Sequence, residues 1–464
     1  MGIHVRLVPF LVLAFALPAS ASGASGLGST LPVWTVAPFV ALLFAIAFLP
    51  LIAHHWWEKN SNKAVIALLL GAAAVGILID RGAPGISALA HSGKEYLAFI
   101  MLLAALYIIS GGIYVGGSLS GTPLMNTGVL AIGAVLASFL GTTGASVLLI
   151  RPLLRANAKR LKKAHIVVFF IFIVSNAGGL LTPLGDPPLY LGFLRGVRFT
   201  WTLGLVWEWV FVVGALLIVF HLWDEAVFNK EERERPGSQL EEVQQHEPMA
   251  IQGYVNVLFL AGVVAAAFCG GYYGPKLGWT EDQQKYGQVG AMGGLAILSL
   301  VMTPAGLRAK NRFTAGPIVE VAVLFAGIFA TMVPALLILE ARGSALHVTE
   351  PWQFFWATGT LSSFLDNAPT YLTFTSAASG LLHTNGSHLN ELLGVAGGEA
   401  ILRAISCGAV FMGANTYIGN GPNFMVKAIA EEAGVKMPSF VGFMAYSALV
   451  LIPIFIGVTL VFFR

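Results

Sequence analysis

The sequence predicts an all-α polytopic membrane protein built from two inverted repeats, each with a re-entrant hairpin and a broken transmembrane helix. Three observations lead to this fold class: the composition, the spacing of apolar segments, and the polar motifs that interrupt those segments. Of the 464 residues, 56% are hydrophobic and 11% are charged, whereas a soluble protein carries about 25% charged residues. The net charge of +3 is too small to indicate a nucleic-acid partner.

The first residues have the layout of a secretory signal peptide, so we expect residues 1–21 to be cleaved from the mature chain. A short basic segment is followed by the apolar run 7–17 and by Ala19-Ser20-Ala21, the small residues typical of a cleavage site. A short first transmembrane helix is the alternative, but this run is shorter than the about 20 residues that a spanning helix needs.

Apolar segments recur along the rest of the chain and give the order of the expected spans. They cover residues 32–53, 64–79, 96–117, 125–150, 165–194, 200–222, 251–273, 286–303, 316–339, 352–379, 399–426 and 438–463. Basic residues gather in five of the connecting loops, which should be cytoplasmic. All five loops fall on one side of the membrane only if two segments, 125–150 and 352–379, each enter and leave on the same side. We therefore predict re-entrant hairpins there, with tips at 141–144 and 365–369.

The two halves of the chain resemble each other at matching positions. The motifs at 182–188 and 416–422 share the pattern Thr-x-(Leu/Ile)-Gly-(Asp/Asn)-x-Pro. Glu95 and Glu320 begin corresponding spans, where a carboxylate suits the helix dipole. Because those spans run in opposite directions, the repeats are inverted, which is typical of secondary transporters. The expected organisation is N-terminal helices over 32–80, repeat 1 over 95–222, a polar cytoplasmic linker over 223–248, connecting helices over 251–303 and repeat 2 over 316–463.

Each repeat also contains an apolar segment that is too irregular to form one helix. In 165–194, the stretch Ser175–Pro188 contains three Gly, three Pro, an Asn and an Asp, which no uninterrupted helix favours. The segment 399–426 is interrupted in the same way at Ala414–Asn423. Non-helical backbone at membrane depth must be buried in protein or line a wet cavity. We therefore predict two broken helices whose breaks form a binding site.

Hydroxyl, amide and carboxylate side chains gather at the two hairpin tips and the two breaks. Such oxygen ligands suit Na⁺ or a proton rather than a soft metal. Asp366 and Asp186 are the candidate sodium ligands, because a buried carboxylate can exchange a proton for a cation. The predicted ion- or substrate-binding residues are Asp366, Asn367, Asp186, Asn176, Thr182, Thr142, Thr143, Ser146, Asn415, Thr416 and Asn420, and Ser175, Thr370 and Asn423 belong to the same polar set.

Three charged residues in this region have both a functional and a structural interpretation. Asp366 is the stronger candidate of the two carboxylates, because it lies midway along its hairpin, at a depth where an ionisable group normally has a function, although it also suits the cap of the returning helix. Asp186 belongs to Gly-Asp-Pro-Pro, which is also a turn sequence, and it is deep only if the helix unwinds. Arg151 is the candidate counter-charge to a carboxylate, with snorkelling to the interface as the alternative.

The motifs at Ser175–Pro188, Leu365–Thr370 and Gly413–Asn423 resemble those of the ion-transporter superfamily. Its members include NhaD-type sodium/proton antiporters, citrate transporters, arsenite carriers and divalent-anion/sodium symporters. The chain resembles in particular the bacterial group of citrate transporters or sodium:proton antiporters, over nearly its whole length after residue 32. The resemblance implies two inverted repeats, two opposed hairpins, ion coupling and elevator-like transport, usually by a dimer.

The resemblance also implies which residues act. In the NhaD type, functional Asp and Thr residues lie in these motifs, which points here to Thr143, Asp186, Asp366 and Asn367. The carboxylate-binding Ser-Asn-Thr tips of the anion symporters are not reproduced, since the tips here contain Thr-Thr-Gly-Ala-Ser and Asp-Asn-Ala-Pro.

We therefore expect a secondary active transporter of the bacterial inner membrane, most simply a Na⁺/H⁺ antiporter in which both cations compete for carboxylates at the membrane midplane. Symport of citrate or a related carboxylate with H⁺ or Na⁺ is the alternative. We expect no enzyme activity and no cofactor beyond the ions, because no Ser/His/Asp, zinc or phosphate motif is present. Cys269 and Cys407 lie in apolar runs, which predicts two buried thiols. The expected partners are the lipid bilayer, a small ion or carboxylate, and a second copy in a homodimer.

Overall fold

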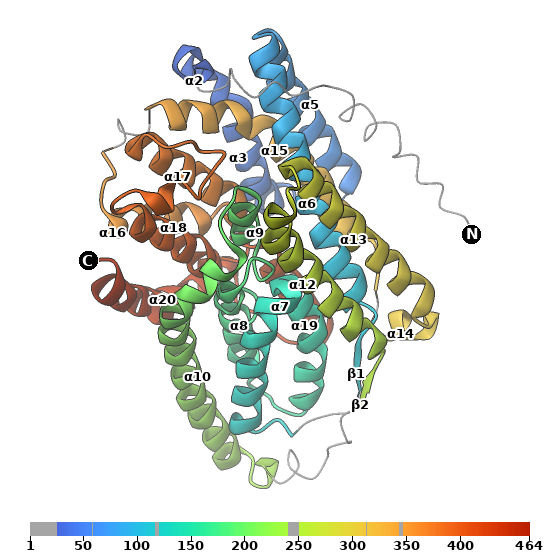
Figure 1. Ribbon diagram of the computed structural model, residues 1–464. Helices are drawn as coiled ribbons and strands as arrows, with labels where there is room; N and C mark the ends of the chain where they lie inside the picture. The colour runs from blue at the N-terminus through green and yellow to red at the C-terminus, as the bar shows by residue number, and fades with distance from the viewer. Residues whose placement is uncertain (1–25, 58, 117–119, 240–249, 312, 343–346) are drawn as a thin grey trace. The chain divides into compact units, whose positions relative to one another are not determined.

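A computed structural model describes residues 26–464, apart from 58, 117–119, 240–249, 312 and 343–346. The predicted signal peptide at 1–21 therefore lies outside the described residues. Within them, the chain is almost entirely helical (Figure 1), and seven helices are long and apolar enough to cross a membrane by length and composition. These helices confirm the predicted class, an all-α polytopic membrane protein.

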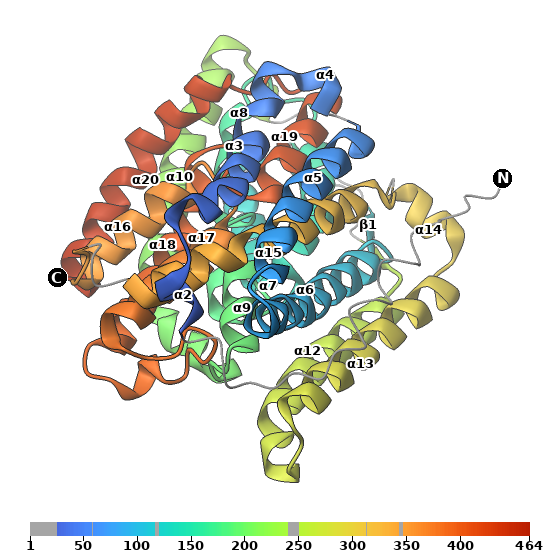
Figure 2. The same cartoon turned by 90° about the horizontal axis from the view of Figure 1, so that it is seen from above.

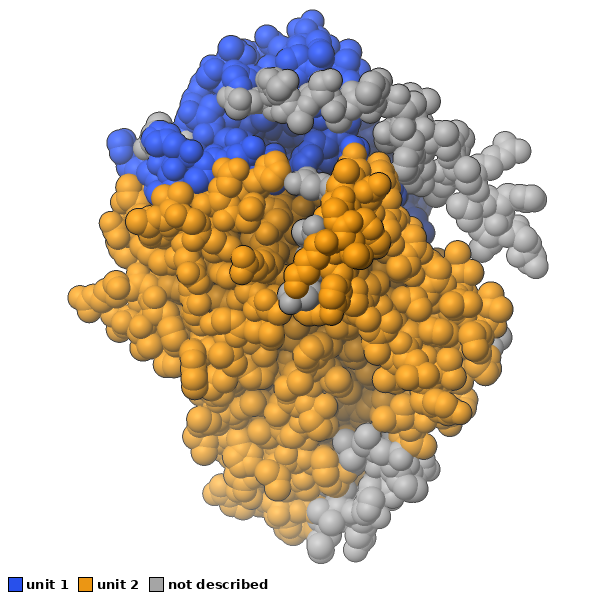
Figure 3. Space-filling view, in the orientation of Figure 1, with its two compact units in different colours: residues 1–100, 316–347, 375–387 blue, residues 101–315, 348–374, 388–464 orange. Residues whose placement is uncertain are grey.

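The chain separates into two compact units (Figure 3). Unit 1 comprises Met1–Ile100, Gly316–His347 and Thr375–Ser387, and unit 2 comprises Met101–Ala315, Val348–Phe374 and His388–Arg464. Every residue of the predicted site belongs to unit 2, so the structure of that unit decides how the site is built.

Unit 1 holds the first helices of the chain together with α15. Small residues let α5 and α15 approach closely, because a Cβ on Gly327 would lie 2.9 Å from that of Ala67. The buried Lys63 pairs with Glu320 at 2.6 Å across the same two helices. The elements of this unit are α2 (Leu27–Thr30), η2 (Val33–Val36), α3 (Ala37–Ile52), α4 (His54–Trp57), α5 (Asn60–Ile79), the first part of α6 (Ala83–Ser110), α15 (Gly316–Arg342) and the last part of α17 (Asn367–Leu382).

Glu95 does not lie where the sequence pattern places it. Helix α6 begins at Ala83, so Glu95 occupies the middle of the helix rather than its first turn. There it is buried and pairs with His91 at 3.4 Å. Polar residues at 91–95 lower the hydropathy of this part of the helix, which hides the true helix start from the sequence pattern.

Unit 2 contains the remaining elements. A two-stranded antiparallel ribbon pairs Val115 of β1 with Ile251 of β2, and α12 and α13 lie side by side (Figures 1 and 2). The elements are β1 (Tyr114–Gly116), α7 (Pro123–Ala156), α8 (Ala164–Ile173), η3 (Ala177–Leu181), α9 (Pro187–Leu194), η4 (Phe199–Leu205), α10 (Val206–Glu234), β2 (Ala250–Gln252), α12 (Val255–Tyr273), η5 (Pro275–Leu277), α13 (Glu281–Met302), α14 (Ala305–Lys310), α16 (Pro351–Ser362), the start of α17, η7 (Leu392–Gly394), α18 (Gly398–Met412), η8 (Gly413–Asn415), α19 (Gly421–Glu432) and α20 (Phe440–Phe462).

Helix α7 folds back on itself. Its helical geometry stops at Gly141, where φ is 76° and ψ is 149°, a conformation that glycine adopts readily and other residues avoid. Gly133 and Leu149 would be about 24 Å apart in a continuous helix. Instead, Leu149 Cδ1 lies 3.1 Å from the position of a Cβ on Gly133. The two arms of α7 on either side of Gly141 therefore pack side by side.

Two long apolar segments are interrupted at their polar motifs. Residues 165–194 lie in α8, η3 and α9, and residues 399–426 lie in α18, η8 and the first turns of α19. All of His165–Ile173 is buried, so α8 runs through the interior of unit 2. Both α9 and α19 have a proline in their first turn, where the missing N–H has no intrahelical partner to lose.

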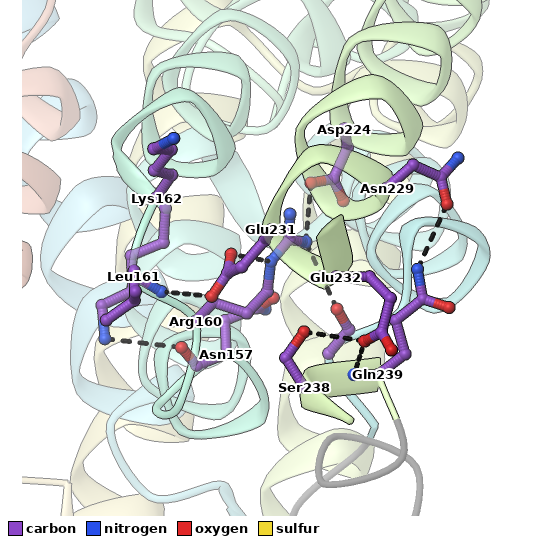
Figure 4. Close-up of polar contacts among 12 residues, drawn as sticks. Asn157, Arg160, Leu161, Lys162, Asp224, Asn229, Glu231, Glu232, Ser238 and Gln239 are labelled. Carbon is purple, nitrogen blue, oxygen red and sulfur yellow. Dashed lines mark hydrogen bonds and ion pairs between the residues drawn. The ribbon is translucent and has the colours of Figure 1, made fainter. Parts of the chain in front are cut away.

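The first part of the predicted linker over 223–248 is helical, because α10 continues to Glu234. Polar residues on the exposed turns of α10 lower its hydropathy and imitate a loop in the sequence. Beyond the helix, the Glu232 carboxylate accepts hydrogen bonds from Gly237 N (2.7 Å), Gln239 N (2.8 Å) and Ser238 Oγ (2.9 Å) (Figure 4). Residues 240–249 lie outside the described part of the chain.

A buried ionic cluster joins this end of α10 to α7 and α8 (Figure 4). Asp224 accepts from Arg160 Nη1 at 2.6 Å. It also accepts from His165 Nε2 at 2.9 Å and from Asn126 Nδ2 at 2.9 Å. Asn126 also exchanges hydrogen bonds with Asn157, at 2.9 and 2.8 Å. Buried charges persist only when they are paired and hydrogen-bonded, so these contacts hold the elements together.

The two thiols differ in environment. Cys407 is buried in α18, as predicted, whereas Cys269 in α12 is exposed. The prediction for Cys269 is therefore wrong, because an apolar helix in a membrane protein can direct apolar side chains outward as well as inward.

Candidate functional site

The buried carboxylate of Asp186 is the centre of the predicted site. Asp186 precedes Pro187 at the start of α9 in an extended conformation, and its side chain is 1% exposed. Oδ1 accepts from Thr142 Oγ1 at 3.0 Å and from Asn420 Nδ2 at 3.3 Å, and Asn367 Nδ2 donates to Oδ2. The structure thus brings residues from the fold of α7, the start of α17 and the start of α19 onto one carboxylate.

Close backbone contacts shape the first break. A Cβ on Gly185 would lie 2.1 Å from the carbonyl oxygen of Gly179, so any side chain at position 185 would collide with the backbone. The hydroxyl of Thr182 donates to the carbonyl of Ser138, and Thr142 N donates to Gly185 O at 2.8 Å. These hydrogen bonds satisfy backbone groups that the missing helical turns leave open, and they fix the break against α7.

The second break has the same construction. The hydroxyl of Thr416 donates to the carbonyl of Ser363, as that of Thr182 does in the first break. A Cβ on Gly419 would lie 2.5 Å from the carbonyl oxygen of Gly413. The motifs that share a sequence pattern therefore also share their hydrogen bonds and their close glycine contacts.

The two breaks differ in one chemically decisive position. Asp186 and Asn420 each precede the second half of their broken helix, with φ and ψ of −143° and 143° for Asp186 and −151° and 140° for Asn420. The backbone is nearly the same, but one break carries a carboxylate and the other a neutral amide.

Amide side chains connect the two breaks. Asn420 Nδ2 donates to Asn176 Oδ1 at 3.2 Å and to Ser175 O at 3.1 Å. Asn176 Nδ2 donates to Asn423 Oδ1 at 2.7 Å, and Asn423 Nδ2 donates to Thr416 O at 2.9 Å. This buried network ties the first break to the second and orders the donors around the carboxylate.

Asp366 lies directly before α17 and has a different environment. Its Oδ1 accepts from Ala368 N at 3.1 Å, and its carbonyl accepts from Thr370 Oγ1 at 3.0 Å. Asp366 therefore caps the helix, which was the structural alternative. The side-chain donors converge on Asp186 rather than on Asp366, the reverse of the expected ranking.

The chain matches one known protein family over most of its length. The family model described as "Putative citrate transport" matches residues 28–463. The chain belongs to this family. The match confirms the resemblance to the ion-transporter and citrate-transporter group and makes the protein a multi-pass, citrate-transport-like membrane transporter. No curated protein matches the chain.

In this citrate-transport family protein, several predicted residues lie near the centre without contacting Asp186. Ser146 Oγ and Ser175 Oγ share a hydrogen bond of 2.8 Å. Asn415 Nδ2 donates to Ser363 Oγ at 2.9 Å. Thr143 follows Thr142 at the fold of α7 and is half-buried. Thr182 and Thr416, as described above, fix the backbone of the two breaks.

The predicted counter-charge is not among the groups that contact the carboxylate. Arg151 lies in the second arm of α7, and no lysine or arginine of the described chain pairs with Asp186. Arg403, in α18, pairs with the buried Glu208 at 2.7 Å. In the citrate-transport family protein, neutral hydroxyl and amide groups thus surround Asp186.

Two amide oxygens in this region have no hydrogen-bond donor within the described part of the chain. They are Asn367 Oδ1 and Asn415 Oδ1, and both atoms are buried. A buried polar atom without a partner is rare in native proteins, and an amide oxygen is a hard ligand suited to Na⁺. The described residues contain no cluster of three His, Cys, Asp or Glu that could hold a metal ion.

Sequence reasoning missed some residues that build the site. Ser138 and Ser363 supply the carbonyls that receive the two threonine hydroxyls, but they lie in helical segments that carry no motif. Asn423 belongs to the polar set but was not among the predicted ligands. Its position one turn after Asn420, on the same face of a helix, is the signal that could have identified it.

Proposed function

We propose that this family member exchanges Na⁺ for H⁺ by alternating access, with the two cations competing for Asp186 and Asp366. The observation that carries the proposal is that no positive charge of the described residues pairs with Asp186, whose three donors are neutral. A buried carboxylate without a cationic partner is unfavourable unless a proton or a metal cation neutralises it. The site therefore has two stable states, one protonated and one holding a cation.

The oxygen atoms around the carboxylate support a cation as the ligand. Asn367 donates its Nδ2 to Asp186 and keeps its Oδ1 without a donor among the described residues. Asn415 Oδ1 is likewise buried and has no donor among the described residues.

The arrangement proposed for the membrane follows from the shared construction of the two breaks. Matching hydrogen bonds and the fold-back of α7 support two inverted repeats, each with a re-entrant hairpin that meets a broken helix. Such repeats move a midplane site between the two faces of the membrane. We propose a bacterial inner-membrane protein that works as a homodimer.

The family description favours a second candidate function, symport of citrate or a related carboxylate with H⁺ or Na⁺. A carboxylate substrate would be repelled by Asp186 and Asp366 unless cations entered with it or a basic residue faced it. Arg151 is the candidate for that role. The neutral donors of Asp186 favour antiport over this alternative.

Proteoliposomes with an imposed pH gradient and an internal pH-sensitive dye separate the two functions. Antiport predicts that external Na⁺ collapses the gradient in the absence of any organic acid. Citrate uptake without Na⁺-driven proton movement would overturn the proposal and support symport. Protein-free liposomes with the same gradient report the leak, and K⁺ in place of Na⁺ reports ion selectivity.

A further inference from the structure

Two basic segments that are far apart in the sequence meet at the β1–β2 ribbon of unit 2. The guanidinium carbon of Arg155, at the end of α7, lies 5.7 Å from the ring centre of Tyr114 in β1. Lys310 Nζ, at the end of α14, lies 5.4 Å from the same ring. Because both side chains contact one tyrosine ring, the two basic segments lie close together at this ribbon.

These positive charges have no carboxylate partner within the described chain. Arg155 Nη2 donates to Val115 O at 2.6 Å, and Lys310 Nζ donates to Gln252 at 3.2 Å. Nearby Arg308 donates to backbone carbonyls instead of to an acid. By contrast, Lys162 in the basic loop after α7 pairs with Glu234 at 3.0 Å. Among the described residues, the positive charges at the ribbon therefore have no acidic partner.

Apolar side chains accompany this charge. All three residues of β2 are exposed, and the exposed fraction is 59% for Ile251 and 72% for Tyr254. A soluble anion needs only the charges, whereas a lipid presents a charged head and an apolar tail together. The combination of cations that pair with no acid of the described chain and exposed apolar groups fits an amphipathic anion.

We propose that this surface, formed by Tyr114, Arg155, Ile251, Tyr254 and Lys310, binds the headgroup of an anionic phospholipid. The phosphate lies between the Arg155 guanidinium and the Lys310 ammonium, and an acyl chain follows Ile251 and Tyr254. The inference does not depend on the transported ion, because none of these five residues contacts the Asp186 site.

Native mass spectrometry of the detergent-purified protein tests the proposal directly. Phosphatidylglycerol is titrated against phosphatidylcholine of the same chain length, and the retained lipid is counted. We expect preferential retention of phosphatidylglycerol. A basic residue near an anionic membrane surface contributes about fivefold in affinity, so Lys310→Gln should weaken binding by about fivefold and Arg155→Gln/Lys310→Gln by about 30-fold.

Control variants separate a loss of lipid binding from a loss of folding and from a general effect of removing a lysine. Lys310 is exposed, so its substitution should leave the melting temperature unchanged. Lys162→Gln removes a paired lysine and should leave phosphatidylglycerol binding unchanged, and Lys310→Arg should retain it. Equal retention of both lipids, unchanged binding by Lys310→Gln, or complete competition by inorganic phosphate would each overturn the lipid assignment.

Discussion

Thr142 Oγ1 donates a hydrogen bond of 3.0 Å to Asp186 Oδ1 and so joins the fold of α7 to the first broken helix. Thr142→Val keeps the shape of the side chain but removes the donor. A hydrogen bond to a charged group contributes about 1.5–3 kcal/mol, so the variant should melt several degrees below the parent. Thr142→Ser is the matched control and should retain the melting temperature. An unchanged melting temperature in the valine variant would show that the contact contributes little.

Asp366→Asn should abolish Na⁺-dependent proton movement while leaving the fold intact. The amide oxygen of asparagine can still accept from Ala368 N, as Asp366 Oδ1 does, so the cap of α17 survives. The amide cannot bind or release a proton, which removes one of the two carboxylates proposed to be shared by the cations. Dye-loaded proteoliposomes measure the transport, and a thermal melt reports the fold. Normal exchange by a well-folded variant would exclude Asp366 from the coupling site.

Competition between the two cations predicts a pH dependence of transport. If one site holds either H⁺ or Na⁺, lowering the pH raises the Na⁺ concentration needed for half-maximal exchange, by at most about tenfold per pH unit for one competing proton. Raising the pH has the opposite effect until the site is fully deprotonated. Initial rates of gradient collapse across a pH series measure this quantity. A half-saturating Na⁺ concentration that stays constant with pH would contradict direct competition.

Gly185→Ala should strongly destabilise the protein, because its Cβ would lie 2.1 Å from the backbone oxygen of Gly179. Neither atom belongs to a flexible side chain, so the break itself must shift, at a cost of about 3 kcal/mol or more. Gly421→Ala is the matched control in the second break, since nothing lies within 4 Å of a Cβ there. We expect a large loss of folded yield for the first variant and none for the second. Equal melting curves would show that the break is more adaptable than its contacts indicate.

Arg160→Gln should be among the most destabilising changes at the other end of unit 2. It leaves the Asp224 carboxylate without its guanidinium partner, which lies at 2.6 Å, and loss of one partner of a buried pair costs about 3–5 kcal/mol. Lys162→Gln breaks an exposed pair with Glu234 and should leave the melting temperature unchanged. Thermal unfolding of the two variants in the same detergent makes the comparison. Similar melting temperatures for the two would mean that the buried cluster is not a structural anchor.

Much of this arrangement could be predicted because interruptions of apolar segments are rare and specific. Glycine, proline and amide residues cluster at Ser175–Pro188 and Ala414–Asn423 and mark the two breaks, since such a cluster is unfavourable in a continuous helix. The shared motif also identified Asp186 and Asn420 as corresponding residues, and the structure gives them nearly the same backbone conformation. The residue types within each motif were therefore sufficient to predict the two breaks.

The remaining features depend on contacts between distant segments. Nothing near Asp186 in the sequence shows that Asn367 will donate to it, and this is why the sequence favoured Asp366 as the principal carboxylate. The start of α6 and the end of α10 were missed for another reason. Hydropathy averages over all faces of a helix, so polar turns such as those around Glu95 resemble a loop until the partner of each side chain is known.

The side-chain nitrogen of Asn420 carries fewer hydrogens than there are acceptor oxygens within hydrogen-bond distance of it. An amide nitrogen carries two hydrogens, yet Asn420 Nδ2 lies within 3.1–3.3 Å of three acceptors: Ser175 O, Asn176 Oδ1 and Asp186 Oδ1. Two hydrogens cannot make a full hydrogen bond to each of three acceptors, and the longest of the three distances is the one to Asp186 Oδ1. A proton on Asp186 Oδ1, or a cation bound to that atom, weakens it as an acceptor, and the two hydrogens of Asn420 Nδ2 can then go to the other two oxygens. The charge state of the Asp186 carboxylate thus determines which hydrogen bonds Asn420 makes between the two broken helices.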